Sequence, residues 1–198
     1  IQYQQATYLT SAVEMKQLPK DSGYEVAFIG RSNSGKSSAL NTITNIKGLA
    51  RTSSTPGRTQ MINLFELDGT HRLVDLPGYG YAKVPKPIQQ RWEAVTHEYL
   101  ETRQSVSGVV LIMDVRHPLK EMDQQIVVWA ASSGVPLHIL LTKSDKLKKA
   151  AQKRTLQDVS EAMEKFPNTS VQLFSSLARE GVVEAKQALD EWFEIAEE

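Results

Sequence analysis

An apolar run leads directly into a glycine-rich segment in Tyr24-Glu-Val-Ala-Phe-Ile29-Gly30-Arg-Ser-Asn-Ser-Gly35-Lys36-Ser37. The second part matches G-x-x-x-x-G-K-[ST], the pattern of a phosphate-binding loop between a strand and a helix. Gly30 and Gly35 allow the backbone to turn sharply and to approach a phosphate closely. Successive N–H groups of the loop and the start of the following helix then face the anion. The sequence therefore predicts a phosphate site made of Gly30, Arg31, Ser32, Asn33, Ser34, Gly35, Lys36, Ser37 and Ser38.

Two side chains of this loop predict that the anion is a nucleotide. Lys36 places a cation where it can reach the β- and γ-phosphates, and Ser37 offers a hydroxyl to Mg²⁺. We therefore expect a nucleotide ligand with Mg²⁺ as cofactor.

The composition is that of one globular domain. Of the 198 residues, 40% are hydrophobic and 23% are charged, which are ordinary values for a chain large enough to bury a full core. The absence of cysteine excludes disulfides, thiolate metal sites and a cysteine nucleophile, and it fits a reducing compartment. No apolar run approaches the ~20 residues of a membrane span, and no signal peptide is apparent. We expect a cytoplasmic protein without a membrane partner.

The 23 basic and 23 acidic residues leave no net charge, so a nucleic-acid partner is not implied by overall charge and is only allowed by local patches. One basic run consists of Lys143, Lys146, Lys148, Lys149, Lys153 and Arg154. Two interpretations of this run stay open, a solvated helix face and a surface for nucleic acid.

Apolar runs alternate with helical patterns along residues 21–198. Strands are predicted at 24–29, 61–67, 71–76, 107–115, 136–142 and 170–175, and helices at 36–46, 86–103, 119–133, 146–165 and 180–196. A hairpin turn is expected at Asp68-Gly69, whereas the later strands are separated by helices and should be parallel. The pattern predicts a three-layer α/β domain with a six-stranded, mostly parallel sheet, one antiparallel strand at its edge, and helices on both faces. Residues 1–20 show no clear period, and we expect them to be an N-terminal extension that packs on this domain.

Ligands of such a sheet bind at the carboxyl ends of its strands. The third predicted strand ends in Asp75-Leu-Pro-Gly78. Two long loops stand out, one at 47–60 before the hairpin strands and one at 77–87 after them. Asp75 can hold Mg²⁺ through water, and the N–H of Gly78 can approach a terminal phosphate. Long loops in a compact domain are usually functional or disordered, and their place beside the phosphate loop favours function.

A later strand ends in Thr142-Lys143-Ser144-Asp145, which predicts that the base is guanine. The Asp145 carboxylate can accept hydrogen bonds from N1–H and N2–H₂ of guanine, whereas adenine presents an acceptor at N1. Because an unpaired buried charge is costly, such a site discriminates strongly between the bases. The stem of Lys143 can cover one face of the ring. After the last strand, guanine O6 can meet N–H groups of Ser175, Ser176 and Leu177.

The order of these motifs resembles the Ras-like GTPase superfamily and, within it, the EngB/YihA/YsxC family of bacterial ribosome-assembly GTPases. The resemblance covers nearly the whole chain and is most specific in Ser54-Thr-Pro-Gly-Arg-Thr-Gln60 and Asp75-Leu-Pro-Gly-Tyr-Gly-Tyr81. It implies a P-loop GTPase that binds GTP and GDP, hydrolyses GTP slowly, and acts in assembly of the large ribosomal subunit, with a link to cell division and septation. The implied partners are ribosomal RNA and ribosomal proteins, and the implied state is a monomer.

The resemblance also implies roles for single residues. The implied Mg²⁺ ligands are Ser37, Thr59 and Asp75, the last through water, and Thr55 is an alternative to Thr59. Loss of the γ-phosphate would free both loops, which is the switch. The residues implied to act on the γ-phosphate are Asn33, Lys36, Thr59 and Gly78.

Tyr79, Thr142 and the segment Ser175-Ser-Leu177 depart from the common pattern, the last of them standing in place of the commoner S-A-K. Tyr79 stands where Ras-like enzymes commonly have a water-orienting glutamine, so we expect slow intrinsic hydrolysis. Related GTPases with an aromatic residue there often bind K⁺ through a phosphate-loop asparagine, and Asn33 is at the matching position. A loop residue that only bonds its own backbone is the other open interpretation of Asn33. Thr142 replaces the asparagine of N-K-x-D, which predicts a weaker link to the phosphate loop.

Other functions stay open at this stage. They are a P-loop kinase of a small molecule, an ATPase, and a nucleotide-dependent binding module with negligible turnover. The guanine motif argues against the first two. Candidate RNA contacts near the two loops are Arg51, Arg58, Lys83, Lys86 and Arg91.

Overall fold

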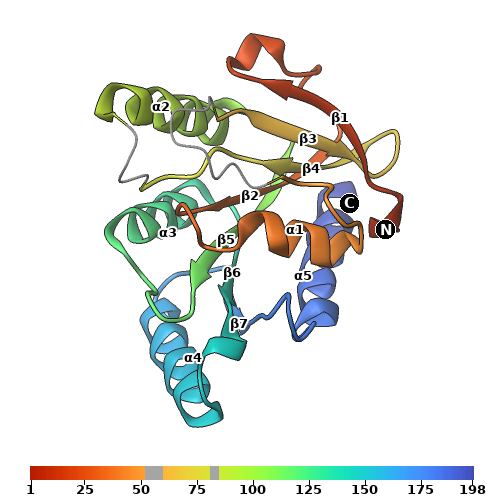
Figure 1. Ribbon diagram of the computed structural model, residues 1–198. Helices are drawn as coiled ribbons and strands as arrows, with labels where there is room; N and C mark the ends of the chain where they lie inside the picture. Colours follow the sequence, from red (N-terminus) through yellow and green to blue (C-terminus); the bar gives the residue numbers. More distant parts are fainter. Residues whose placement is uncertain (52–59, 81–84) are drawn as a thin grey trace.

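The computed structural model describes residues 1–51, 60–80 and 85–198 and contains one seven-stranded sheet in the order β1-β3-β4-β2-β5-β6-β7 (Figure 1). The strands are β1 (Thr7–Ala12), β2 (Tyr24–Gly30), β3 (Ile62–Glu66), β4 (His71–Asp75), β5 (Val106–Asp114), β6 (Leu137–Thr142) and β7 (Thr169–Leu173). The α-helices are α1 (Lys36–Thr44), α2 (Lys86–Thr102), α3 (Glu121–Ser133), α4 (Lys149–Met163) and α5 (Val182–Glu197), and the short 3₁₀ helices are η1 (Tyr3–Gln5), η2 (Met15–Gln17) and η3 (Ser144–Lys146).

The predicted mixed sheet is confirmed. Strand β2 pairs in parallel with β4 and β5, and the parallel pairing continues through β6 to β7. Strand β3 runs against both of its neighbours, β1 and β4. Its hairpin with β4 turns at the predicted place, where the N–H of Leu67 donates to the carbonyl of His71 at 2.9 Å.

The prediction of six strands was one too few, and the antiparallel strand does not lie at the edge. The missing strand is β1, which pairs with β3 and covers it. Its side chains are mostly exposed, so the segment has no alternation of apolar and polar residues to mark it. An edge strand of this kind is held mainly by backbone pairing, which leaves little trace in a sequence.

Alternate residues of the central strands enter two separate cores. On one face, Ala27 and Ile29 of β2 pack with side chains of α2, α3 and α4. On the other face, Val26 and Phe28 pack with side chains of α1 and α5. Figure 1 shows the same division of the helices between the two faces of the sheet. The result is the predicted three-layer arrangement, in which the carboxyl ends of β2, β4, β5 and β6 share one edge.

A fully buried carboxylate fixes the other end of the sheet. Glu25 at the start of β2 accepts hydrogen bonds from Tyr99 Oη (2.8 Å) and Arg72 Nε (2.7 Å). Arg103 adds two more from Nε (3.0 Å) and a terminal nitrogen (2.9 Å). A buried charge is tolerated only when it is paired and hydrogen-bonded in this way. The network attaches the C-terminal end of α2 to the sheet, at the end opposite the phosphate loop.

Gly108 lets α5 approach β5, and Gly108→Ala is expected to destabilise the fold. A Cβ at this position would lie 2.3 Å from Cε3 of the Trp192 ring, which is itself buried. Overpacking of a core costs about 1–3 kcal/mol, so the urea midpoint should fall. Gly69→Ala is the matched control, because a Cβ there meets no atom within 4 Å. Equal midpoints for the two variants would contradict the expectation.

None of the helices in the described residues is both long enough and apolar enough to cross a membrane.

Candidate nucleotide-binding site

The phosphate loop has the predicted setting. Strand β2 ends at Gly30, and α1 begins at Lys36. Two loop residues adopt the left-handed conformation, Gly35 with φ +94° and Asn33 with φ +64°. Glycine enters this region without a steric penalty, and asparagine is one of the few other residues that does so often. These two positions turn the chain from the strand into the helix.

The loop presents a set of N–H groups suited to an anion. Within the described residues, no hydrogen bond is donated by the N–H groups of Asn33, Gly35, Lys36, Ser37 and Ser38. Four of these belong to the start of α1, where the helix dipole also favours negative charge. The hydroxyl of Ser34 is buried in the same loop and has no partner. Free N–H groups at a helix start are the arrangement that binds phosphate groups in proteins.

Lys36 and Asp75 meet at the centre of the site. The Asp75 carboxylate, at the end of β4, accepts a hydrogen bond from Lys36 Nζ, and both side chains are largely buried. Ser37 follows Lys36 in the first turn of α1 and is also buried. Within residues 1–51, 60–80 and 85–198, no three acidic, histidine or cysteine side chains gather to hold a metal on their own. One carboxylate and one hydroxyl next to phosphates suit Mg²⁺, which keeps several waters and takes other ligands from the nucleotide.

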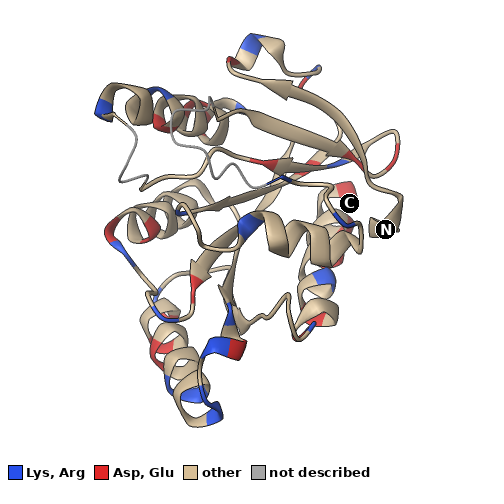
Figure 2. Cartoon of the chain, viewed as in Figure 1, with Lys and Arg blue, Asp and Glu red and all other residues tan. Residues whose placement is uncertain are grey.

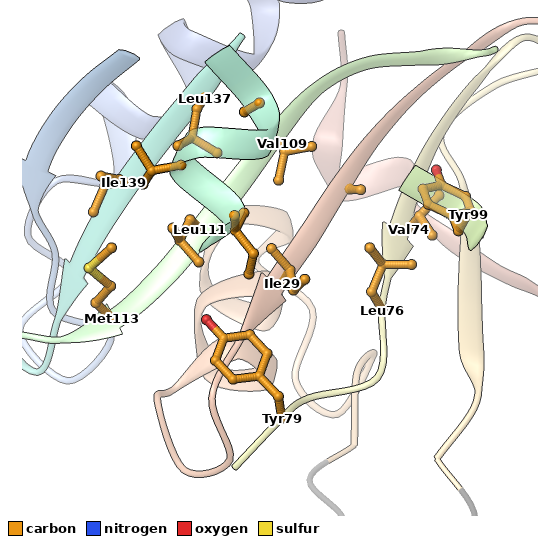
Figure 3. Packing of buried hydrophobic residues seen from close by; sticks show 14 of the residues in the cluster. Ile29, Val74, Leu76, Tyr79, Tyr99, Val109, Leu111, Met113, Leu137 and Ile139 are labelled. Atoms are coloured by element: carbon orange, nitrogen blue, oxygen red, sulfur yellow. The ribbon is translucent and has the colours of Figure 1, made fainter. Parts of the chain in front are cut away.

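Tyr79 is directed away from the phosphate loop. Its ring packs in the core beside Ile29 and Leu111 (Figure 3), and its hydroxyl donates a hydrogen bond to Asp123 of α3. Burial raises the pKa of the Tyr79 hydroxyl well above its usual range, so the group stays neutral. The backbone of Tyr79 is fixed as well. Its N–H donates to Gly30 O (3.3 Å), and its carbonyl accepts the N–H of Ser32 (2.7 Å).

Gly78 is buried between Asp75 and this fixed tyrosine, at the carboxyl end of β4. The candidate switch threonines Thr55 and Thr59 lie outside the described residues, as do Arg58 and Lys83.

The Thr142 hydroxyl reaches the phosphate loop in spite of its shorter side chain. It lies within hydrogen-bond reach of the carbonyl oxygens of Ser34 and Met113, the latter at 3.0 Å. Lys143 Nζ donates to the carbonyl of Asn33 at 2.7 Å. Two side chains therefore attach the end of β6 to the loop.

Asp145 lies in η3, beside the end of β7. Its Oδ1 accepts a hydrogen bond from Ser175 Oγ at 2.7 Å, while the N–H of Ser175 donates to the carbonyl of Glu180 at 3.0 Å. Ser175 therefore orients the carboxylate, and its own N–H is already used. Within the part of the chain that the structure describes, the N–H groups of Ser176 and Leu177 donate to no acceptor. These two remain the candidates for guanine O6.

A cavity of about 490 Å³ joins the two halves of the site. This is a typical size for a small-molecule pocket. It is lined by Gly35, Ser38, Asn41, Thr42, Lys47, Gly48, Thr142, Lys143, Asp145, Lys146, Ser176 and Leu177. The structure thus brings the phosphate loop and both predicted base segments to one pocket.

Lys47 and Gly48 belong to the loop 47–60 that was expected to be functional, whereas the lining residues Asn41 and Thr42 were not predicted from the sequence. The side chain of Asn41 explains the position of these loop residues, because it accepts the N–H of Ala50 (2.6 Å) and donates to the carbonyl of the same residue (2.9 Å). This clip folds Lys47 and Gly48 over the pocket. A lone helical asparagine gives no signal of such a contact in a sequence.

Known proteins share this arrangement. Residues 25–143 match the family model described as 50S ribosome-binding GTPase. A protein named probable GTP-binding protein EngB from Coxiella burnetii is 59% identical over 192 residues, which are 96% of this chain and 94% of that protein. The protein of the same name from Escherichia coli is 55% identical over 194 residues, covering 98% and 92% of the two chains.

Solved structures agree on the fold. The crystal structure of a probable GTP-binding protein EngB has a TM-score of 0.70 at 21% identity and covers 86% of this chain and 98% of that one. A bacterial selenocysteine-specific elongation factor, EF-Sec, has a TM-score of 0.62 at 20% identity over 87% of this chain and 29% of that one. With the phosphate loop, the carboxylate pocket and relatives of more than half identical sequence, the chain belongs to the EngB family of P-loop GTPases, which bind GTP and GDP with Mg²⁺ and hydrolyse GTP.

Proposed function

We propose that this GTPase is a slow nucleotide switch that acts in assembly of the large ribosomal subunit, as a cytoplasmic monomer. The observation that carries the proposal is the match of residues 25–143 to the 50S ribosome-binding GTPase model. It is joined by a pocket lined both by the phosphate loop and by Asp145, the carboxylate proposed to bind guanine. A two-state nucleotide pocket is what an assembly step needs in order to bind and then release a particle.

The positions of the site residues support the following roles. The N–H groups of the loop and Lys36 bind and orient the phosphates, and Asp145 and Lys143 hold the base. When bound, Mg²⁺ neutralises charge on the β- and γ-phosphates, and Ser37 and Asp75 are the described residues that would hold it. Gly78, which has no side chain to intervene, would offer its N–H to the γ-phosphate. Catalysis is then positioning and electrostatic stabilisation for attack by water.

Slow hydrolysis is supported by the place of Tyr79. Its hydroxyl is held by Asp123 in the core and cannot orient a water at the γ-phosphate. A residue in this position that orients water supplies much of the rate in Ras-like enzymes. Without such a residue, the GTP-bound form persists until another group, from a partner or an ion, completes the catalytic site.

Asn33 is the proposed K⁺ contact, and K⁺ is expected to accelerate hydrolysis over Na⁺. Its side chain is exposed and makes no hydrogen bond within the described residues, which leaves the amide oxygen available. Removing one stabilising contact to transition-state charge costs about 10²–10³ in rate, so we expect K⁺ to accelerate hydrolysis by at least about tenfold. The measurement is single-turnover hydrolysis in K⁺ and Na⁺ at matched ionic strength. Asn33→Ala should abolish the difference, and a wild-type rate indifferent to the cation would remove K⁺ from the site.

Co-sedimentation tests the ribosomal role. The protein is loaded with GDP or a non-hydrolysable GTP analogue and centrifuged with large or small ribosomal subunits. We expect binding to the large subunit that is stronger with the analogue. Equal recovery with both subunits, or with neither, would contradict the proposal.

A binding module with negligible turnover is the second candidate, and the burial of Tyr79 favours it. Single-turnover hydrolysis with and without large subunits separates the two. An activated GTPase accelerates on the particle, whereas a binding module does not.

A further inference from the structure

Five cations gather where η3 passes into α4, and we call them the α4 cationic patch: Lys146, Lys148, Lys149, Lys153 and Arg154. All five are exposed, and none forms an ion pair within the residues that the structure describes. Figure 2 shows them as blue segments on η3 and on α4, in the lower part of the view.

Two residues of the patch, Lys148 at the N-cap and Lys149 at the first position of α4, lie where positive charge is least favourable for the helix. The N-terminus of a helix carries the positive end of the dipole, so cations there destabilise it. The first turn of α4 contains no acidic residue. The acidic side chains Glu161 and Glu164 lie in the last turn and at the C-cap, where the dipole again opposes them. The charges at the two ends of α4 therefore do not stabilise the helix through its dipole, which favours a role in binding for the cations at its start.

The patch is fixed rigidly to the base-binding segment. The buried side chain of Gln152 donates to the carbonyls of Ser144 (2.7 Å) and Leu147 (3.0 Å). This fastens the first turn of α4 to η3, which carries Asp145. In the sheet, β6 lies on one side of β2 and β5, whereas β4, which carries Asp75, lies on the other. The patch is thus at the base end of the pocket and away from the γ-phosphate end.

We infer that the α4 cationic patch binds the phosphate backbone of folded RNA and serves as an anchor of equal strength with GTP and GDP. Unpaired lysines and arginines on one face are the electrostatic footprint of a nucleic-acid site. A membrane surface fits less well, because α4 offers no free apolar face to insert beside its cations. The apolar side chains Val159 and Met163 of α4 are already buried in the core. In naming RNA, the inference rests on the proposed ribosomal function.

The test compares two triple variants with the same change in charge. Lys148→Ala/Lys149→Ala/Lys153→Ala removes three cations of the patch, and Lys16→Ala/Lys20→Ala/Lys165→Ala removes three exposed lysines elsewhere. Lys146 is left in place because it lines the base pocket. Binding to a mixed-sequence RNA duplex is measured by fluorescence anisotropy over a salt series, and binding to large ribosomal subunits by co-sedimentation, each with GDP and with a GTP analogue.

We expect the patch variant to lose at least about tenfold in RNA affinity at low salt and to show a salt slope smaller by about 2–3, since each phosphate contact contributes about one unit. The loss should be the same with both nucleotides. GDP affinity should not change, and the thermal midpoint should stay or rise, because cations are removed from the start of a helix. The control variant should bind like the wild type.

Several outcomes would overturn the inference: equal RNA binding by the two variants, a loss confined to one nucleotide state, or tighter binding of the wild type to phosphatidylglycerol vesicles than to RNA at the same salt. A different result would contradict the proposed ribosomal function while leaving the RNA-binding patch intact. In that case the wild type binds the duplex through the patch but does not sediment with large subunits.

Discussion

Asp145→Asn is expected to change the base preference from guanine to xanthine, with a loss of GDP affinity on the order of 10⁴-fold, the range by which sites built for a hydrogen bond reject an analogue that lacks it. The carboxylate accepts from both N1–H and N2–H₂ of guanine. A carboxamide has one acceptor and one donor, so its NH₂ group would face the NH₂ group of guanine. Xanthine carries an oxygen at that place and accepts the new donor.

The structure indicates that the substitution keeps the geometry of the site. Ser175 Oγ donates to Asp145 Oδ1 at 2.7 Å, and the amide oxygen of asparagine can accept the same hydrogen bond. The NH₂ group of the amide would then face the base. Competition of GDP, XDP and ADP for a fluorescent nucleotide measures the preference. Asp158→Asn, an exposed carboxylate of α4, is the matched control and should bind like the wild type. An unchanged order of preference in the Asp145 variant would show that another group reads the base.

The sequence predicted most of the segments that line the pocket, because the phosphate loop is local in the chain. A strand, a turn of glycines and a helix start are adjacent in the chain, so the phosphate loop could be recognised from residues 24–37 alone. The carboxyl ends of parallel strands then meet at one edge, which placed Asp75 and Asp145 near the loop without any distance being known.

Contacts between distant residues were not predictable in the same way. Tyr79 was recognised as a departure from glutamine, but its partner Asp123 is 44 residues away on another element. The short side chain of Thr142 led us to expect a weak link to the phosphate loop. Side-chain length alone does not show how closely β6 approaches the loop, and the hydroxyl of Thr142 does reach the carbonyl of Ser34. Strand β1 was missed because its side chains are mostly exposed and its pairing is made by the backbone.

Removal of Mg²⁺ is expected to weaken binding of a GTP analogue by about 10³-fold, and Asp75→Asn should remove most of that dependence. In the structure, the cation that faces Asp75 is Lys36. When Lys36 turns to the phosphates, the carboxylate loses its partner and faces a group of negative charges. Leaving a buried charge without its partner costs about 3–5 kcal/mol, which corresponds to this loss of affinity. Mg²⁺ would supply a new cation for Asp75. The nucleotide phosphates would then pair with Lys36 and the metal with Asp75, so that both partners of the ion pair keep an opposite charge.

The neutral asparagine carries no charge that needs a partner, so the difference in affinity between Asp75→Asn and the wild type should change sign between the two conditions. With EDTA, Asp75→Asn should bind the analogue more tightly than the wild type, and with Mg²⁺ it should bind more weakly. Titration calorimetry under both conditions measures the four affinities, and Asp158→Asn again serves as the matched carboxylate control. If the Asp75 variant kept the full Mg²⁺ dependence of the wild type, the exchange of Lys36 for the metal would be wrong. The metal would then act on the phosphates alone, and the contact between Lys36 and Asp75 would matter only to the stability of the fold.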